Sequence, residues 1–152
     1  MILAKGLGMP TDDALTLALV EDDLGHARLI ERNLRRAQVS HDIVAITDGQ
    51  EALDFIVQAS LESPPRSLLV LLDLNLPGLN GHQVLSRLKT NERTQSIPVI
   101  ILTTTAEPHE IETCYTLWCS AYLVKPVEYD QFVEVIRALG LFLSMIRVPN
   151  QR

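Results

Sequence analysis

The chain has 152 residues, 47% of them hydrophobic, which is enough for one domain with a substantial core. Its formal net charge of −6 argues against nucleic acid or an anionic membrane surface as a direct partner, so a protein partner is expected. Two cysteines are too few for a disulfide scaffold and are expected to be reduced core thiols. The chain shows neither a signal-peptide pattern nor an apolar run of membrane-spanning length, so a cytoplasmic location is expected.

Short apolar runs alternate with amphipathic stretches along the chain. The runs that predict strands are 15–20, 41–46, 68–72, 98–102 and 122–124. The stretches that predict helices are 25–38, a helix opened by 48–51 that reaches the loop at 60–67, then 82–91, 107–118 and 129–146. This alternation predicts an α/β fold, with a parallel sheet covered on both faces through right-handed crossovers.

The predicted organisation is one domain. Residues 1–13 are expected to form a flexible N-terminal arm, residues 14–146 the domain, and residues 147–152 a C-terminal tail with no output domain attached.

Polar side chains stand where the predicted strands end. Glu21 and Asp22 follow the first strand, Asp73 the third, Thr103 the fourth and Lys125 the fifth. In open α/β sheets the chemistry sits at the carboxyl ends of the strands. Three acids, one hydroxyl and one amine are therefore expected to converge on one crevice.

The grouping has a chemical logic. Three neighbouring carboxylates repel one another unless a cation is present, and oxygen ligands of this kind suit Mg2+. Asp73 would be a nucleophile for phosphorus, and Lys125 and Thr103 would bind the oxygens of the phosphoryl group. Asn75, two residues further on, could turn its backbone carbonyl to the metal.

For several of these residues a purely structural role is an alternative interpretation. An acid after a strand can simply cap a helix, and this is the reading preferred for Asp23. Chemistry alone does not distinguish Thr103 from Thr104 and Thr105, although the first residue after the apolar run is preferred. No ligand spacing is found, and hence no site role is expected, for His26, His41, His82 and His109.

The segments LTLALVEDD, LLVLLDLNLPGLNG, PVIILTT and AYLVKP resemble the response-regulator receiver domains of two-component systems. The motifs are an acidic pair, an Asp followed by xxxPxxxG, a Thr and a Lys-Pro pair, in this order and each after a strand. The resemblance implies a flavodoxin-like, doubly wound (βα)5 fold with a five-stranded parallel sheet in the order 2-1-3-4-5. It further implies that a sensor histidine kinase phosphorylates Asp73. The implied Mg2+ ligands are Glu21, Asp22, Asp73 and the backbone carbonyl of Asn75.

The same resemblance assigns switching roles. Thr103 is expected to be the switch hydroxyl, Tyr122 the aromatic switch and Lys125 the phosphate-binding lysine. The Lys125–Pro126 peptide bond is expected to be cis. A receiver of this kind is a phosphoacceptor that assists its own phosphorylation and dephosphorylation, rather than an enzyme acting on a separate substrate.

The resemblance also suggests partners. The face made by the helix at 107–118, the strand at 122–124 and the last helix is expected to change on phosphorylation and to form a homodimer. In its DLNLP segment, its long loop and its expected lack of an output domain, the chain looks similar to the small regulators paired with cyanobacterial phytochrome kinases. A phytochrome-type kinase is therefore the candidate partner.

The chain departs from the family pattern in its N-terminal arm, in its longer loop at 60–67, and at Trp118-Cys119, where small residues are common. Two other function classes fit these residues less well. A phosphatase of the haloacid dehalogenase type needs a second Asp two residues after the nucleophile, and Asn75 cannot serve as its acid or base. A phosphorylation-independent binding module is disfavoured by the intact set of acids, hydroxyl and lysine.

Overall fold

The computed structural model describes residues 15–149, so the expected arm at 1–13 and the last residues of the expected tail lie outside the described residues. Five parallel strands form one sheet in the order β2-β1-β3-β4-β5. The strands are β1 (Thr16–Val20), β2 (Asp42–Ile46), β3 (Leu68–Leu72), β4 (Val99–Thr103) and β5 (Ala121–Val124). The predicted flavodoxin-like fold, with its strand order 2-1-3-4-5, is confirmed.

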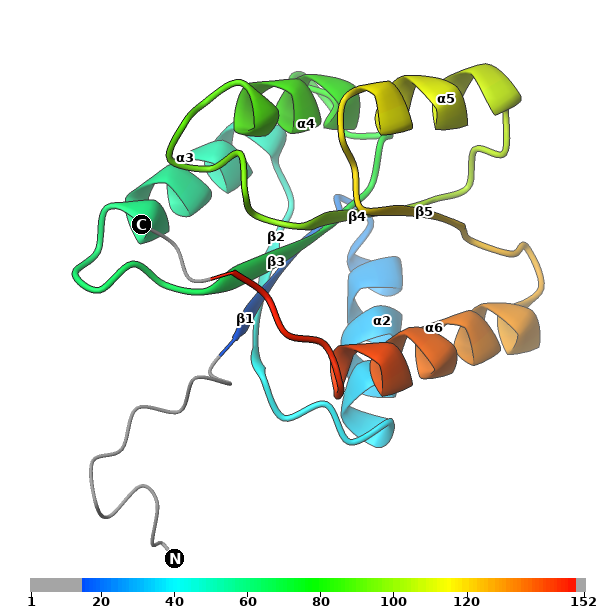
Figure 1. The fold of residues 1–152 in the computed structure, drawn as a ribbon. Coiled ribbons are helices and arrows are strands. Elements are labelled where there is room, and N and C mark those ends of the chain that lie inside the picture. Colours follow the sequence, from blue (N-terminus) through cyan, green and yellow to red (C-terminus); the bar gives the residue numbers. More distant parts are fainter. Residues whose placement is uncertain (1–14, 150–152) are drawn as a thin grey trace, which may run out of the picture.

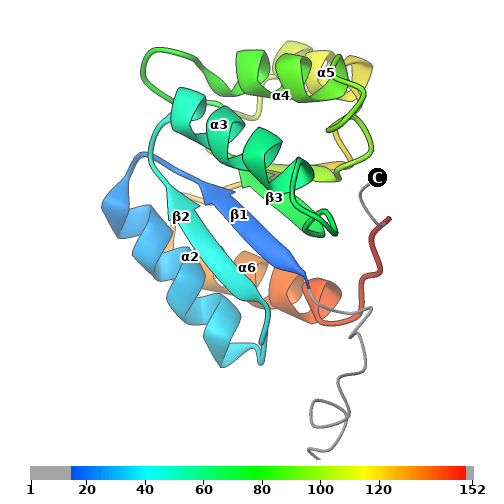
Figure 2. The ribbon, with the colours of Figure 1, turned by 90° about the vertical axis from the view of Figure 1, so that its left-hand side faces the viewer.

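Helices cover both faces of this sheet. One face carries α2 (Leu24–Arg36) and α6 (Tyr129–Leu143), and the other carries α3 (Gly49–Ser60), α4 (Gly81–Lys89) and α5 (Pro108–Thr116) (Figure 1). The view from the side shows the same three layers, with β1, β2 and β3 between the two groups of helices (Figure 2). None of the helices within residues 15–149 has the length and apolar character needed to cross a bilayer.

The continuous apolar runs are explained by burial on both faces of the sheet. Alternate residues of β3 point to opposite sides: Leu68, Val70 and Leu72 enter the core under α3, α4 and α5, whereas Leu69 and Leu71 enter the core under α2 and α6. All residues of β1, β3 and β4 are buried. The edge strands β2 and β5 are only partly covered, which explains why their sequences are less uniformly apolar.

The two cysteines lie in the core of the domain. Cys114 and Cys119 are free and buried, as expected, and burial raises the pKa of the Cys114 thiol to about 12.

Trp118, which stands where small residues are common in receivers, has a φ of 69° and a side chain that is 77% exposed. A positive φ is a conformation that glycine adopts most readily, so Trp118 has a backbone conformation unusual for a bulky residue.

Helices α2 and α6 approach each other closely at Gly140. A Cβ atom at this position would lie 2.5 Å from the Cβ of Ala37, which follows the last turn of α2. The absent side chain thus allows the two helices to pack against the same face of the sheet. This face holds the first turn of α2, which carries residues next to the site described below.

Replacing Gly140 by Ala is expected to destabilise the fold. Overpacking costs about 1–3 kcal/mol, which exceeds the roughly 1 kcal/mol that Ala contributes to helix propensity. Urea denaturation would measure the loss, and the double variant Gly140→Ala with Ala37→Gly should recover most of it by removing the opposing methyl group. A Gly140→Ala variant as stable as the wild type would show that overpacking costs no more than the roughly 1 kcal/mol that Ala contributes to helix propensity.

Candidate functional site

The backbone N–H groups of Glu21, Asp73 and Lys125 extend the strand ladders by one hydrogen bond each. The Glu21 N–H donates to the carbonyl oxygen of the last residue of β2, with an N–O distance of 2.9 Å. The Asp73 N–H donates to the carbonyl oxygen of the last residue of β1 at 3.0 Å. The Lys125 N–H donates to the last residue of β4 at 2.6 Å. The parallel register of the sheet therefore places these three side chains at one edge.

Two glycines hold the loop that follows Asp73. A Cβ on Gly81 would lie 2.4 Å from the carbonyl oxygen of Asp73 and 2.5 Å from the Cα of Leu74. A Cβ on Gly49 would lie 2.3 Å from the carbonyl oxygen of Leu79 in the same loop. The first turns of α4 and α3 thus contact the loop backbone directly. This packing explains the glycine that ends the xxxPxxxG motif.

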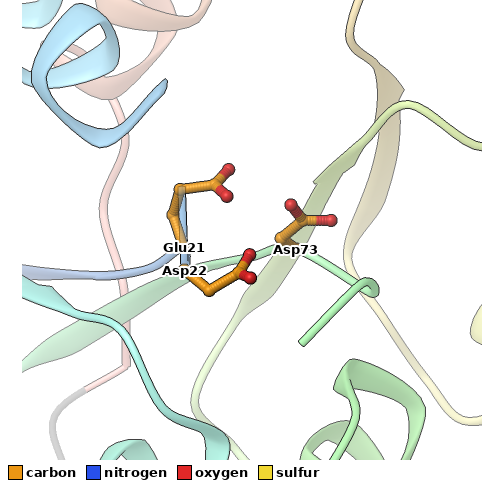
Figure 3. A group of neighbouring side chains, drawn as sticks. All are labelled: Glu21, Asp22 and Asp73. Atoms are coloured by element: carbon orange, nitrogen blue, oxygen red, sulfur yellow. The ribbon is translucent and has the colours of Figure 1, made fainter. Parts of the chain in front are cut away.

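Three carboxylates meet where β1 and β3 end (Figure 3). Glu21, Asp22 and Asp73 each offer an oxygen, and these oxygens lie within 4.8 Å of one another. Glu21 is 2% exposed and Asp73 6% exposed, whereas Asp22 is exposed. The cluster is therefore buried on the side of the sheet and open to solvent on the side of Asp22.

Lys125 supplies the one ammonium that contacts this cluster among the described residues. The residue is 3% exposed, and its Nζ donates to Asp73 Oδ2 at 3.0 Å and to Glu21 Oε1. Its third contact is the Nδ1 atom of His26, at 3.2 Å. A buried ammonium is costly unless it is paired, and here two carboxylates and a ring nitrogen surround it.

The two buried carboxyl groups differ in acidity. Burial raises the pKa of Glu21 to about 7, because the loss of hydration outweighs the hydrogen bond and charge of Lys125. Burial alone would also raise the pKa of Asp73, but the hydrogen bond from the Asn75 N–H and the charge of Lys125 hold it below its usual value. Asp73 is therefore an anion at neutral pH.

Thr103 is the one of the three successive threonines whose side chain is buried beside Asp73. It is the last residue of β4 and is 0% exposed, and its hydroxyl also favours the charged form of Asp73. Asn75 Nδ2 lies 3.5 Å from Thr103 Oγ1 and 3.5 Å from Thr104 Oγ1. The predicted hydroxyl, acids and lysine thus come together, and their roles in chemistry stay predictions.

Tyr122 lies beside the site on β5. Its ring is partly buried against the core, and its hydroxyl donates to the carbonyl oxygen of Thr105 at 2.7 Å. Burial raises the pKa of this phenol to about 12, so it keeps its proton and remains a donor. Its backbone N–H donates to the Tyr115 hydroxyl of α5 at 3.2 Å. Tyr122 thus bonds both to the loop that begins just after Thr103 and to α5.

The expectation that the Lys125–Pro126 bond is cis is wrong. The Lys125–Pro126 bond is trans, and the one cis peptide bond among residues 15–149 joins Ser63 and Pro64. Residues 125–128 contain no hydrogen-bonded turn, and the trans form of an X–Pro bond is favoured by about 0.5–1 kcal/mol. Lys125 reaches the acidic cluster from this trans backbone.

Sequence reasoning missed His26. It lies in the first turn of α2, where its N–H donates to Asp23 Oδ1 at 3.0 Å, so the predicted capping role of Asp23 is confirmed. The one available signal was its place five residues after Glu21, near the end of a strand. That spacing matches no metal or catalytic motif, and only the fold brings the imidazole to Lys125.

Replacing Glu21 by Gln is expected to flatten the pH dependence of stability in the metal-free protein. A carboxyl group with a pKa of 4.5 when unfolded and about 7 when folded contributes stability that is fully present below pH 4.5 and is lost as the pH rises through 7. The difference in unfolding free energy between wild type and Glu21→Gln should therefore fall by up to about 3 kcal/mol across this window.

Urea denaturation in the presence of a chelator would measure this difference. Asp22→Asn removes an exposed carboxylate of the same cluster and is the matched control. An equal flattening in Asp22→Asn would show that the total charge of the cluster, rather than the burial of Glu21, sets the pH dependence.

Comparison with known proteins places this site in a family. The model of the response regulator receiver domain matches residues 17–137. The crystal structure of a receiver domain from Rhodospirillum rubrum is 48% identical, covers 90% of this chain and 99% of its own, and superposes with a TM-score of 0.85. The response regulator Rcp1 from Synechocystis is 32% identical over 88% of this chain and 92% of its own length.

Two solved structures add detail about the relatives. The Mn2+-bound form of Rcp1 is 31% identical, covers 88% of this chain and 98% of its own, and has a TM-score of 0.79. The phosphorylated cyanobacterial phytochrome response regulator RcpA is 32% identical, covers 90% of this chain and 99% of its own, and has a TM-score of 0.80. The chain therefore belongs to the response regulator receiver domain family, and phytochrome response regulators are among its relatives.

Proposed function

We propose that this response regulator accepts a phosphoryl group on Asp73 from a partner histidine kinase. The observation that carries the proposal is the environment of one carboxylate. Asp73 is ionised, held by Lys125 and by the Asn75 N–H, and joined by the buried Glu21 and the solvent-exposed Asp22. An anionic carboxylate beside a fixed cation is suited to attack phosphorus.

The proposed step is a direct transfer from a phosphohistidine. A carboxylate oxygen of Asp73 attacks phosphorus, the new O–P bond forms as the N–P bond breaks, and the donor imidazole keeps the electron pair and takes up a proton from solvent. Lys125 neutralises the phosphoryl oxygens from the interior, where its position is set by the end of β5. The chain thereby assists its own phosphorylation and dephosphorylation, without a separate substrate to turn over.

The donor set fits a divalent cation. When all three acids are ionised, one ammonium leaves an excess of two negative charges in a cluster whose oxygens lie within 4.8 Å of one another. The raised pKa of Glu21 reflects the cost of leaving that carboxylate charged where it is buried. The residues that would hold Mg2+ are Glu21, Asp22, Asp73 and the backbone carbonyl of Asn75. When bound, the ion would offset the charge of the incoming phosphoryl group.

The switching roles follow from contacts at the end of β4. A phosphoryl group on Asp73 would offer the Thr103 hydroxyl a new acceptor. If Thr103 moves toward it, the loop that follows Thr103 would move as well, and the carbonyl oxygen of Thr105 in this loop accepts the hydrogen bond from the Tyr122 hydroxyl. Tyr122 in turn contacts the Tyr115 hydroxyl of α5. Phosphorylation would thus change the α5–β5–α6 face by shifting a population between two states.

That face is the proposed surface for a second copy of the chain. It exposes large apolar side chains: Tyr115 at 49%, Trp118 at 77%, Val127 at 99% and Tyr129 at 59%. Exposed apolar groups of this size are typical of an interaction surface. A phytochrome-type histidine kinase is the proposed partner upstream, supported by the likeness to Rcp1 and RcpA, and the exchange would take place in the cytoplasm.

Phosphorylation with a small acyl-phosphate donor tests the proposal. Wild type is expected to gain one phosphoryl group only when Mg2+ is present, because the metal offsets the charge that repels the donor. Asp73→Asn is expected to gain none, because an amide oxygen is a poor nucleophile. Intact mass spectrometry would count the groups, and light scattering of the same samples would show whether phosphorylation drives dimerisation.

Asp54→Asn is the matched control, because Asp54 is an exposed aspartate of α3. It should behave as wild type. Equal incorporation into wild type and Asp73→Asn would exclude Asp73 as the acceptor, and incorporation that survives a chelator would exclude the role proposed for Mg2+.

A further inference from the structure

The Lys125 ammonium has three N–H donors and three acceptors in the structure. Glu21 Oε1 and Asp73 Oδ2 accept two of them, and His26 Nδ1 lies 3.2 Å from the same nitrogen. An ammonium can only donate, so the His26 nitrogen that faces it is the acceptor, and the proton of the neutral ring sits on Nε2.

The three acceptors differ in what phosphoryl transfer demands of them. Asp73 loses its negative charge when it becomes an acyl phosphate, and Glu21 is a proposed ligand of the metal. His26 takes part in neither event, since it is not one of the three clustered carboxylates. Its contact with Lys125 is therefore the one of the three that can persist unchanged through the cycle.

The His26 ring is held in place independently of Lys125. Its backbone N–H donates to the capping residue Asp23 at 3.0 Å. Its ring meets the ring of Phe132 on α6 edge to face, with centroids 5.6 Å apart and planes at 81°. The imidazole side chain is 38% exposed, so it borders both the buried lysine and the solvent. A ring that packs against Phe132, on a helix turn whose backbone is capped, can in turn fix a flexible lysine.

We propose that His26 is a positioning residue for phosphoryl transfer, holding the Lys125 ammonium where the phosphoryl oxygens arrive. This role rests on the proposed function of Asp73 as phosphoacceptor. Lysine has a long stem with many rotamers, so loss of its constant acceptor would lower the fraction of molecules with the ammonium correctly placed. The effect would fall on the rate of transfer rather than on folding or on the metal ligands.

Two variants separate the hydrogen bond from the ring contact. His26→Phe keeps a ring against Phe132 and removes the acceptor, whereas His26→Asn loses the ring and can place its amide oxygen near the position of Nδ1. The rate of phosphorylation by a small acyl-phosphate donor in Mg2+ is expected to fall about tenfold in His26→Phe, as for loss of a hydrogen bond to a charged group. His26→Asn should stay within about threefold of wild type if the acceptor is what matters.

A second readout reports on Lys125 without any chemistry. The 15N-ammonium NMR signal of Lys125, assigned with Lys125→Arg, should be protected from solvent exchange in wild type and His26→Asn and should broaden in His26→Phe. Loss of rate in His26→Asn but not in His26→Phe would overturn the proposal, because the ring contact would then be the cause. Equal rates in all three proteins would overturn it as well.

Failure of the proposed function would look different. Wild type would then gain no phosphoryl group although its Lys125 signal is protected, and the positioning role would fall with it. Mg2+ affinity, measured by calorimetry, should be unchanged in both His26 variants. A loss of affinity in His26→Phe would mean that the residue acts on the metal site, and would overturn a role confined to Lys125.

Discussion

The burial of the Lys125 ammonium is the constraint on which this site depends. A charge that is 3% exposed is costly without partners, and Glu21, Asp73 and His26 supply them. Burial also acts on Glu21, whose pKa rises because the loss of hydration outweighs the hydrogen bond and charge of Lys125. The site therefore holds an excess of negative charge of the kind that a divalent cation offsets.

The backbone around this charge is closely packed, whereas the side chains bond to one another through hydrogen bonds. Strand ladders close at Glu21, Asp73 and Lys125, and the loop after Asp73 is packed against Gly81 and Gly49 with no room for a methyl group. By contrast, the contacts made by the Asp73, Lys125 and Thr103 side chains are hydrogen bonds that a phosphoryl oxygen can replace. Such a division would suit the proposed switch, which needs fixed positions with exchangeable bonds.

Most of the fold and the main site residues could be predicted from the sequence, because the chemistry is tied to the ends of continuous apolar runs. LTLALV and LLVLL read as strands buried on both faces, and the acids directly after them must then share an edge of the sheet. Asp23 could likewise be read as a helix cap from its position alone. The strand order, however, came from the family resemblance, since periodicity does not specify which strands are neighbours.

Only the tertiary structure decided the contacts that no local pattern encodes. His26 and Lys125 are 99 residues apart, and the packing of α2 and α6 on one face of the sheet brings Phe132 against the His26 ring. The isomer of the Lys125–Pro126 bond also escaped prediction, because an X–Pro bond is governed by a small energy difference that the surrounding chain resolves. Local sequence thus determined which groups stand at the ends of strands, and three-dimensional packing determined which of them touch.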